Sequence, residues 1–207
     1  MKLKQFAYLL LICLVTMLSF ASQAFAKEPV DPSTLNPPPP PEFNPVCKST
    51  GNGTICTVSF SDPPFSGGTG IICGSGANTY EVLQFQNRSV QGTRYYDQNG
   101  NLIRRHFHEV VSGTVTNPLT HTALSYEGKG NTLHDLSTLG DITSGTVVFT
   151  GTTRVFAAHG GSVFFESGRT VSAGDGSFIR ESGPHPLLDY FVFGDTSGIR
   201  PLCDALE

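Results

Sequence analysis

Basic residues are scarce in this chain. It contains 13 lysine and arginine residues against 17 aspartate and glutamate residues, which gives a formal net charge of −4 at pH 7. A protein surface that binds nucleic acid needs lysine and arginine side chains gathered in one place, and the sequence shows no such gathering. The composition therefore excludes nucleic acid as an expected partner.

Long apolar runs are missing except at the N-terminus. The run from Phe6 to Phe20 follows Lys2 and Lys4, and it is shorter than the ~20 residues that a membrane-spanning helix needs. The small residues of Ala24-Phe25-Ala26 then form a typical cleavage signal. We predict a secretory signal peptide over residues 1–26, cleaved after Ala26, a secreted or periplasmic mature chain, and no membrane insertion of that chain.

Proline is concentrated in one segment. Residues 27–45 include five consecutive prolines, Pro37 to Pro41, and proline both fixes φ and removes a backbone donor. This composition predicts a semi-rigid polyproline spacer. The globular domain is therefore expected to cover residues 46–207, a length that suits one domain with its own core.

Helical periodicity is absent after Val46, where β-branched, aromatic and glycine residues dominate. This composition predicts an all-β domain. Short clusters of glycine, asparagine, aspartate and proline separate the predicted strands, so consecutive strands should form antiparallel hairpins. The predicted strands are 54–60, 80–95, 102–116, 122–127, 146–150, 153–157, 162–171, 177–181 and 188–193, and residues 134–145 are expected to form a longer loop or a helical turn.

Sequential hairpins of this number can bury their apolar faces in two ways. They can close into an up-and-down β-barrel, or they can fold into a two-sheet β-sandwich; we favour the barrel because closure removes exposed edges. The long strands 80–95 and 102–116 must bend, and Gly92 and Gly113 are candidate sites for bends or bulges.

The C-terminal half carries a pattern of small, acidic and cysteine residues that resembles a recurrent group of small exported bacterial β-barrel proteins. The resemblance implies that architecture and no particular activity. The matching residues are Gly168, Arg169, Asp175, Gly176, Glu181, Gly183, Pro184, His185 and Cys203.

Better-known barrels fit less well. Lipocalins carry a glycine-x-tryptophan signature, and this chain has no tryptophan. Dirigent-like and allene-oxide-cyclase-like barrels resemble it only in size and hairpin order, so they suggest a shape and no chemistry.

A possible metal site lies in the predicted strand 102–116. Gly100, followed by five residues and then His106-Phe107-His108, resembles the opening of the cupin metal motif. Side chains at i and i+2 of a strand point to the same face, so both imidazoles can reach one divalent transition metal. The glutamate that the motif requires next is missing, and Glu109 faces the opposite side. The alternative is that His106 and His108 form part of a polar strand face, with no cofactor.

Motifs for nucleophilic catalysis are missing. The sequence contains no G-x-S-x-G elbow and no S-x-x-K motif. Glu166 and Glu181 lie on neighbouring predicted strands and are candidates for an acid–base pair. Arg169 and Arg180 are close to them in sequence, which also allows cross-strand ion pairs.

Two functional hypotheses follow. In the first, the protein is a non-catalytic exported β-barrel that binds a small ligand or a cell-surface component. In the second, it is a barrel enzyme, either metal-dependent through His106 and His108 or of cyclase or isomerase type. The aromatic residues of the C-terminal hairpins fit either a ligand pocket or an ordinary core: Phe164, Phe165, Phe178, Phe191 and Phe193.

Four cysteines follow the signal peptide, in spacings that match no zinc motif: Cys47, Cys56, Cys73 and Cys203. An even number in an exported chain predicts two disulfides, with three pairings open. A closed barrel would bring Cys73 close to Cys203, which leaves Cys47 to pair with Cys56 across a short loop. The main alternative joins Cys56 to Cys73 and Cys47 to Cys203.

Overall fold

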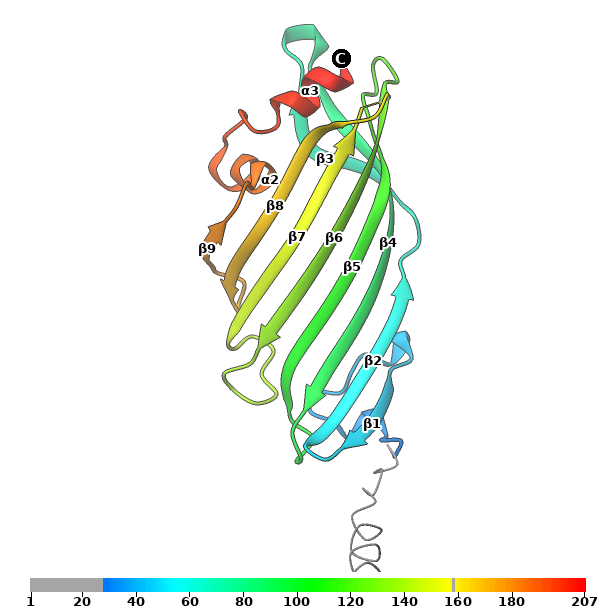
Figure 1. Cartoon of the computed structure of the whole chain (residues 1–207), viewed down its shortest axis with the longest axis vertical. Coiled ribbons are helices and arrows are strands. Elements are labelled where there is room, and N and C mark those ends of the chain that lie inside the picture. Colours follow the sequence, from blue (N-terminus) through cyan, green and yellow to red (C-terminus); the bar gives the residue numbers. More distant parts are fainter. Residues whose placement is uncertain (1–27, 158) are drawn as a thin grey trace, which may run out of the picture.

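The computed structural model describes residues 28–157 and 159–207, so the predicted signal peptide lies outside the described residues. These residues form one antiparallel sheet of nine strands, with neighbours in the order β1-β2-β4-β5-β6-β7-β8-β9 and β3 paired to β4 (Figure 1). The strands are β1 (Val46–Thr50), β2 (Gly53–Ser61), β3 (Phe65–Cys73), β4 (Tyr80–Tyr96), β5 (Leu102–Thr116), β6 (Ala123–Asp135), β7 (Thr146–Phe156), β8 (Ser162–Ala173) and β9 (Phe178–Ser182).

Short helical segments complete the described chain. The N-terminal segment contains the 3-10 turns η1 (Pro32–Thr34) and η2 (Pro41–Phe43), and η3 (Gly76–Asn78) precedes β4. After β9 come α2 (Pro186–Leu188), the π-helical turn η4 (Asp189–Phe193) and α3 (Arg200–Leu206).

β2 and β3 lie end to end along the same edge of β4. β2 pairs with β4 from Thr54↔Tyr96 to Ser61↔Ser89, and β3 continues the pairing in the same direction from Phe65↔Gln86. The interruption falls at Pro63 and Pro64, which have no backbone N–H to donate to a ladder.

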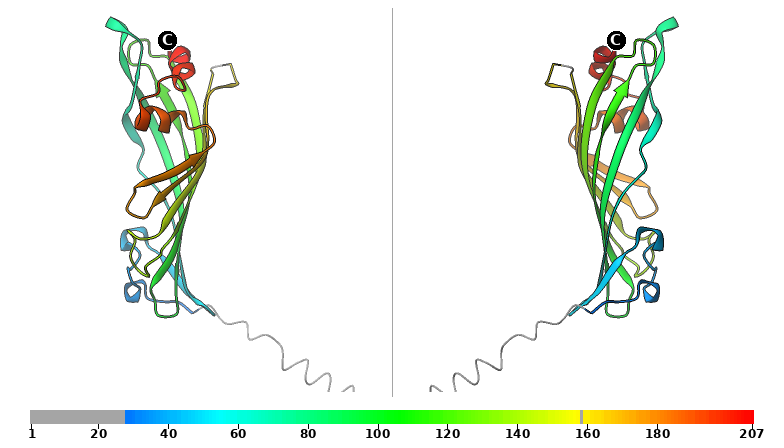
Figure 2. Two further views of the ribbon diagram at one scale, coloured as in Figure 1. Left: turned by 90° about the vertical axis from the view of Figure 1, so that its left-hand side faces the viewer. Right: turned by 90° about the vertical axis from the view of Figure 1, so that its right-hand side faces the viewer.

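The sheet is curved, and the short helical segments that pack against it lie on one side, the concave side (Figure 2). Alternation along β4 shows which residues face the concave side, because Tyr80, Val82, Val90, Gly92 and Tyr96 are buried while the other residues of the strand are more exposed. The convex face is left to solvent, which is the usual arrangement for one face of an antiparallel sheet.

One end of the concave face is filled by the C-terminal cover, which we define as residues 186–206. Ile199, Leu202 and Leu206 are at most 2% exposed and pack in one cluster with concave side chains of the sheet, including Val82 and Phe164. This cluster is the larger of two apolar clusters, so α3 contributes directly to the main core.

The other end is filled by the N-terminal cover, residues 28–45. Leu35 is buried in a second cluster with Tyr96, Leu102 and the cysteines of β1 and β2. Asn36 donates its backbone N–H to Gly100 O and accepts from Leu102 N, at 2.8 and 2.7 Å. The proline-rich residues, expected as a spacer outside the domain, are packed on the sheet in this structure.

The fold confirms the all-β class and the antiparallel hairpin order. The sheet is not closed into a barrel within the described residues, because β9 pairs only with β8 and no strand joins it to β1 or β3. The covered concave face gives the domain a second layer, which is closer to the two-layer alternative than to an up-and-down barrel.

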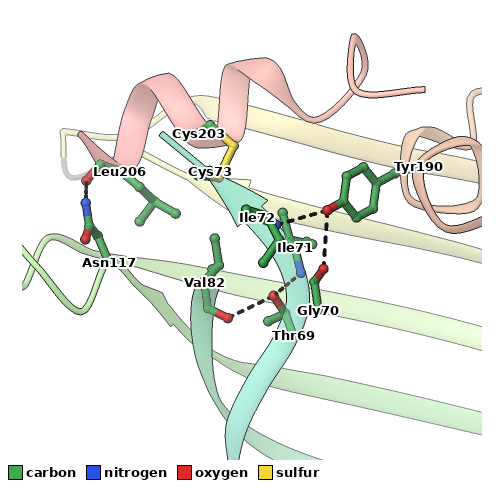
Figure 3. The surroundings of a disulfide bond; sticks show 10 residues. All are labelled: Thr69, Gly70, Ile71, Ile72, Cys73, Val82, Asn117, Tyr190, Cys203 and Leu206. Atoms are coloured by element: carbon green, nitrogen blue, oxygen red, sulfur yellow. Dashed lines mark hydrogen bonds between the residues drawn. A yellow bond between two sulfur atoms is a disulfide. The ribbon is translucent and has the colours of Figure 1, made fainter. Parts of the chain in front are cut away.

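A tyrosine and a disulfide take the place of strand closure (Figure 3). The Tyr190 hydroxyl accepts a hydrogen bond from Ile72 N at 3.0 Å and donates to Gly70 O at 3.3 Å, so it satisfies two backbone groups on the open edge of β3. At the end of the same strand, Cys73 is bonded to Cys203 of α3. The C-terminal cover therefore ties the far side of the sheet to β3.

The disulfide pairing was predicted correctly. Cys47 is bonded to Cys56, its direct cross-strand partner, and Cys73 to Cys203. The reason for the second bond differs from the expected barrel closure, since Cys203 lies on a helix that returns across the concave face. Both bonds are typical of proteins in oxidising compartments. Among the described residues, no helix has the length and apolar character to cross a membrane.

Several predicted strand boundaries were wrong. Residues 188–193 are helical, the predicted strands 146–150 and 153–157 are a single strand, and β6 extends to Asp135 instead of ending at 127. β1 and β3 were not predicted at all. The bulge in the long β4–β5 pair lies between Tyr95 and Tyr96, not at Gly92 or Gly113.

The two disulfides should differ in their effect on stability. Replacing Cys73 and Cys203 together by alanine opens a loop with a sequence separation of 130 residues, against 9 for Cys47 and Cys56. We expect the first pair of substitutions to lower the free energy of unfolding by up to about 4 to 5 kcal/mol and the second by about 3 kcal/mol or less. Urea unfolding measures both, and a larger loss for the Cys47–Cys56 variant would contradict this expectation.

Tyr190→Phe should loosen the edge of β3. The substitution keeps the ring and removes only the hydroxyl, so Ile72 N and Gly70 O each lose a partner, at a cost of roughly 1 to 2 kcal/mol. Native-state hydrogen exchange should show faster exchange of the Ile72 amide. Tyr95→Phe, on the opposite face of β4 from the core, is the control; equal protection of Ile72 in both variants would count against the role of Tyr190.

Candidate functional site

The predicted metal ligands lie on the convex face. His106 is opposite Leu133, and His108 is opposite Asn131, whose Oδ1 lies 3.0 Å from His108 Nδ1. The two histidines share one face of β5, as their spacing requires. Within residues 28–157 and 159–207, no group of three or more histidine, cysteine, aspartate or glutamate side chains is arranged to hold a metal. The metal site therefore stays a prediction, without a third protein ligand in the described part of the chain.

The concave face holds a different site. A pocket of about 50 Å³ lies there, with lining from β5, β6, β7 and β8 and from the segment just before α2. This space is several times the ~10–15 Å³ that one water molecule requires. Its walls are formed by Glu109, Val111, Phe149, Thr153, Glu166 and His185.

Glycines form the floor of the pocket. Gly130 pairs with Gly151, and Gly151 pairs with Gly168, so three adjacent strands carry no side chain in one cross-strand row. A Cβ atom at Gly130 or Gly151 would lie 2.7 or 2.8 Å from the Phe149 ring. These glycines let an aromatic ring lie on the backbone, and they leave a hollow where a continuous row of side chains would fill the concave face.

His185 lies over the last glycine of the row. A Cβ atom at Gly168 would be 2.3 Å from His185 Nε2 and 2.3 Å from Ser182 O. Gly183, at φ +101°, provides the turn that returns the chain to β8, and Ser167 N then donates to Pro184 O at 3.0 Å. The segment Gly183-Pro184-His185 therefore serves to place one imidazole on the pocket floor.

Glu166 contacts this imidazole. Glu166 Oε1 is 3.8 Å from His185 Nδ1, and Glu166 Oε2 accepts a hydrogen bond from Leu187 N at 3.2 Å. The side chains of His185 and Glu166 are only 5% and 20% exposed. Burial raises the pKa of Glu166 above its usual range and outweighs the opposing effect of the hydrogen bond from Leu187.

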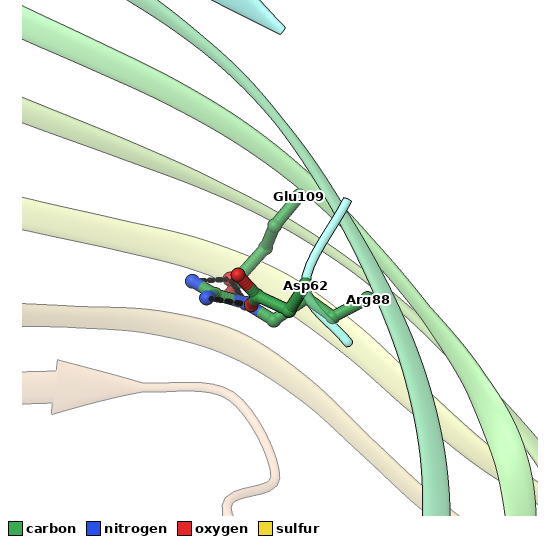
Figure 4. A network of polar contacts seen from close by, with 3 residues as sticks. All are labelled: Asp62, Arg88 and Glu109. Carbon is green, nitrogen blue, oxygen red and sulfur yellow. Dashed lines mark hydrogen bonds and ion pairs between the residues drawn. The ribbon is translucent and has the colours of Figure 1, made fainter. Parts of the chain in front are cut away.

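Glu109 enters the pocket from the other side as part of a charged triad with Arg88 and Asp62 (Figure 4). Arg88 donates to Asp62 Oδ2 at 2.8 Å and to Glu109 Oε2 at 2.9 and 3.0 Å. The hydrogen bond to Asp62, followed by that to Glu109, raises the pKa of Arg88. All three side chains are 29 to 40% exposed, so each pair contributes at most about 1 kcal/mol. The triad fixes Glu109 in place more than it stabilises the fold.

The predicted pairing of Glu166 with Glu181 is not formed. Glu181 lies opposite Thr170, four residues along β8 from Glu166, which corresponds to about 13 Å of strand. Arg169 and Arg180 make no ion pair within the described residues. The sequence places Glu109 on the strand face opposite the histidines but does not link it to Glu166, because that link depends on the register of four strands.

Comparison of the chain with family models, with curated proteins and with solved structures finds no match. The chemistry of the pocket must therefore be argued from its own residues. The hollow is surrounded by the carboxylates of Glu109 and Glu166 and the imidazole of His185, and the Phe149 ring forms part of one wall. Several residues of the C-terminal pattern, among them Gly168, Gly183 and His185, build this hollow.

Glu166→Gln should change how stability depends on pH. A carboxyl whose pKa is raised by folding disfavours the folded state once the unfolded chain ionises, so wild-type stability should fall relative to the variant as the pH rises from near 4.5, the usual glutamate value. The variant should be the more stable protein at neutral pH, with the difference shrinking below pH 4.5. Urea unfolding across this range tests the prediction, with Glu127→Gln on the convex face as the control.

If the difference in the free energy of unfolding between Glu166→Gln and wild type grows as the pH falls, the pKa of Glu166 is not raised. Several exposed aspartates also affect stability in acid, because hydrogen bonds that they accept lower their pKa values. The donors are in Ser33, Asn101, Thr143, Ser177 and Ser197. These groups destabilise all the variants alike in acid.

Proposed function

We propose that this protein is an exported, non-catalytic binding protein that takes a small polar ligand, or the polar end of a larger molecule, in the concave pocket. The observation that carries the proposal is the hollow of about 50 Å³ at the glycine row Gly130–Gly151–Gly168, beside the Phe149 and His185 rings that lie over the row. The hollow remains beside these rings although closely packed interiors are the rule.

Export supports this reading. The proposed signal peptide ends at Ala26, and the described chain has two disulfides that suit an oxidising compartment, one of which joins the C-terminal cover to β3. A rigid frame of this kind suits a preformed site, since binding then orders few further groups.

The polar groups of the pocket support binding of a polar ligand. Glu109, Glu166 and His185 converge on the hollow from three different parts of the chain. A few fixed polar groups in a concave site are what orients a small ligand. The aromatic residues of the C-terminal hairpins do not line it: Phe164 is buried in the main core, whereas Phe165, Phe178, Phe191 and Phe193 are at least 42% exposed.

Filling the pocket tests the proposal. Thr153 lines the hollow from β7, so Thr153→Met should fill it and abolish binding, whereas Thr152→Met places the same side chain on the convex face. Glycerol, glucose, acetate, methylammonium and guanidinium serve as probes. NMR detects their binding through shifts of the amide signals of the floor glycines.

We expect at least one probe class to shift the signals of Gly130 and Gly151 in wild type and in Thr152→Met, but not in Thr153→Met. The proposal fails if no probe shifts these signals in the wild-type protein. It also fails if Thr153→Met responds in the same way as wild type.

A further inference from the structure

His185 Nδ1 and Glu166 Oε1 face each other in the pocket at 3.8 Å, which is beyond hydrogen-bond distance. Nε2 of His185 is 3.0 Å from Ser182 O, and because a carbonyl can only accept, Nε2 carries the proton. In a neutral imidazole Nδ1 is then an acceptor. It faces Glu166 Oε1, also an acceptor, at 3.8 Å.

The remaining atoms of this pair are already used. Glu166 Oε2 accepts from Leu187 N, and the His185 ring is 95% buried over Gly168. Two acceptors that face each other are stabilised by a group that donates a hydrogen bond to both. Nδ1 and Oε1 both belong to residues that line the hollow, and a bound molecule there can supply the donor.

The charges around the hollow favour a positive ligand. Besides Glu166, the nearby ionisable groups are Glu109 on β5 and Asp189 on η4, whose charge also raises the pKa of Glu166. Arg88 is engaged by Asp62 and Glu109. Lys129 contributes to the lining from β6, but alternation places its side chain on the convex face, opposite Thr152.

The size of the hollow limits what can enter. About 50 Å³ accommodates a head group of a few heavy atoms and not a whole drug-sized molecule. The Phe149 ring lies across Gly130 and Gly151 at the floor, and an aromatic ring is a favourable neighbour for a cation.

We infer that the ligand of this pocket carries an ammonium or guanidinium group, whose N–H donors bind Glu166 Oε1 and His185 Nδ1 while the triad of Asp62, Arg88 and Glu109 adds its net negative charge. This inference rests on the proposed function and specifies the chemistry of its ligand. It requires both a positive charge and at least two N–H donors on the same head group.

Glu166→Gln is the decisive variant. The glutamine can place its N–H₂ group toward His185 Nδ1 while its carbonyl still accepts from Leu187 N, so the missing donor is supplied from within the protein. The variant should fold with a melting temperature equal to or above that of wild type, and it should bind methylammonium and guanidinium at least about tenfold more weakly. Glu127→Gln removes the same charge from the convex face of β6 and should bind as wild type does.

NMR titration of the Gly130, Gly151 and His185 signals separates the possible results. Methylammonium and guanidinium should bind the wild-type protein, tetramethylammonium should bind at least about tenfold more weakly because it has no N–H donor, and acetate should not bind. Tetramethylammonium or acetate binding as tightly as methylammonium would overturn the inference, as would unchanged binding by Glu166→Gln.

The two proposals fail in different ways. If glucose, glycerol or acetate shifts the floor glycines and Thr153→Met abolishes that shift, while neither cation binds, the pocket is a ligand site and the inference about cations is wrong. If no probe shifts these signals, both proposals are wrong.

Discussion

The structure depends on covering one face of a curved sheet that does not close on itself. A closed barrel covers its interior with its own strands, whereas here the concave face is covered by the two ends of the described chain. α3 and η4 fill one end, and Leu35 with its proline-rich neighbours fills the other. Each cover is held near a disulfide, one at Cys73 and Cys203 and one at Cys47 and Cys56. The first bond joins the C-terminal cover to β3, whereas the N-terminal cover is held by the backbone hydrogen bonds of Asn36 and by the packing of Leu35.

The candidate site lies on the part of the concave face between the two covers. The row Gly130, Gly151 and Gly168 has no side chains of its own, and the hollow lies there beside the Phe149 and His185 rings. The sheet supplies Glu109 and Glu166 from strands that are three neighbours apart, and the C-terminal cover adds His185. Curvature directs side chains on the concave face toward one another, and for this reason residues from distant strands share one hollow.

The strands whose side chains alternate clearly could be predicted from the sequence. Segments whose secondary structure depends on contacts with distant residues could not. β4 and β5 were predicted to within a residue, and the disulfides were paired correctly. β3, Phe65–Cys73, was missed because its three glycines interrupt any apolar pattern, although pairing to β4 makes it a strand. Residues 188–193 have the composition of a strand, but Pro186 begins a helix and Tyr190 is held against β3. Glu109 and Glu166 are 57 positions apart in the numbering, and only the register of the sheet brings them to one pocket.

The path of the chain also bears on how the protein folds. From β4 to β9 every strand pairs with its neighbour in sequence, so this part of the sheet can assemble from local hairpins, which form quickly. The open edge of β3 is different, because its partners Tyr190 and Cys203 come more than a hundred residues later. This edge must stay unpaired until the C-terminal residues reach it, and docking of the C-terminal cover is the step that completes the fold.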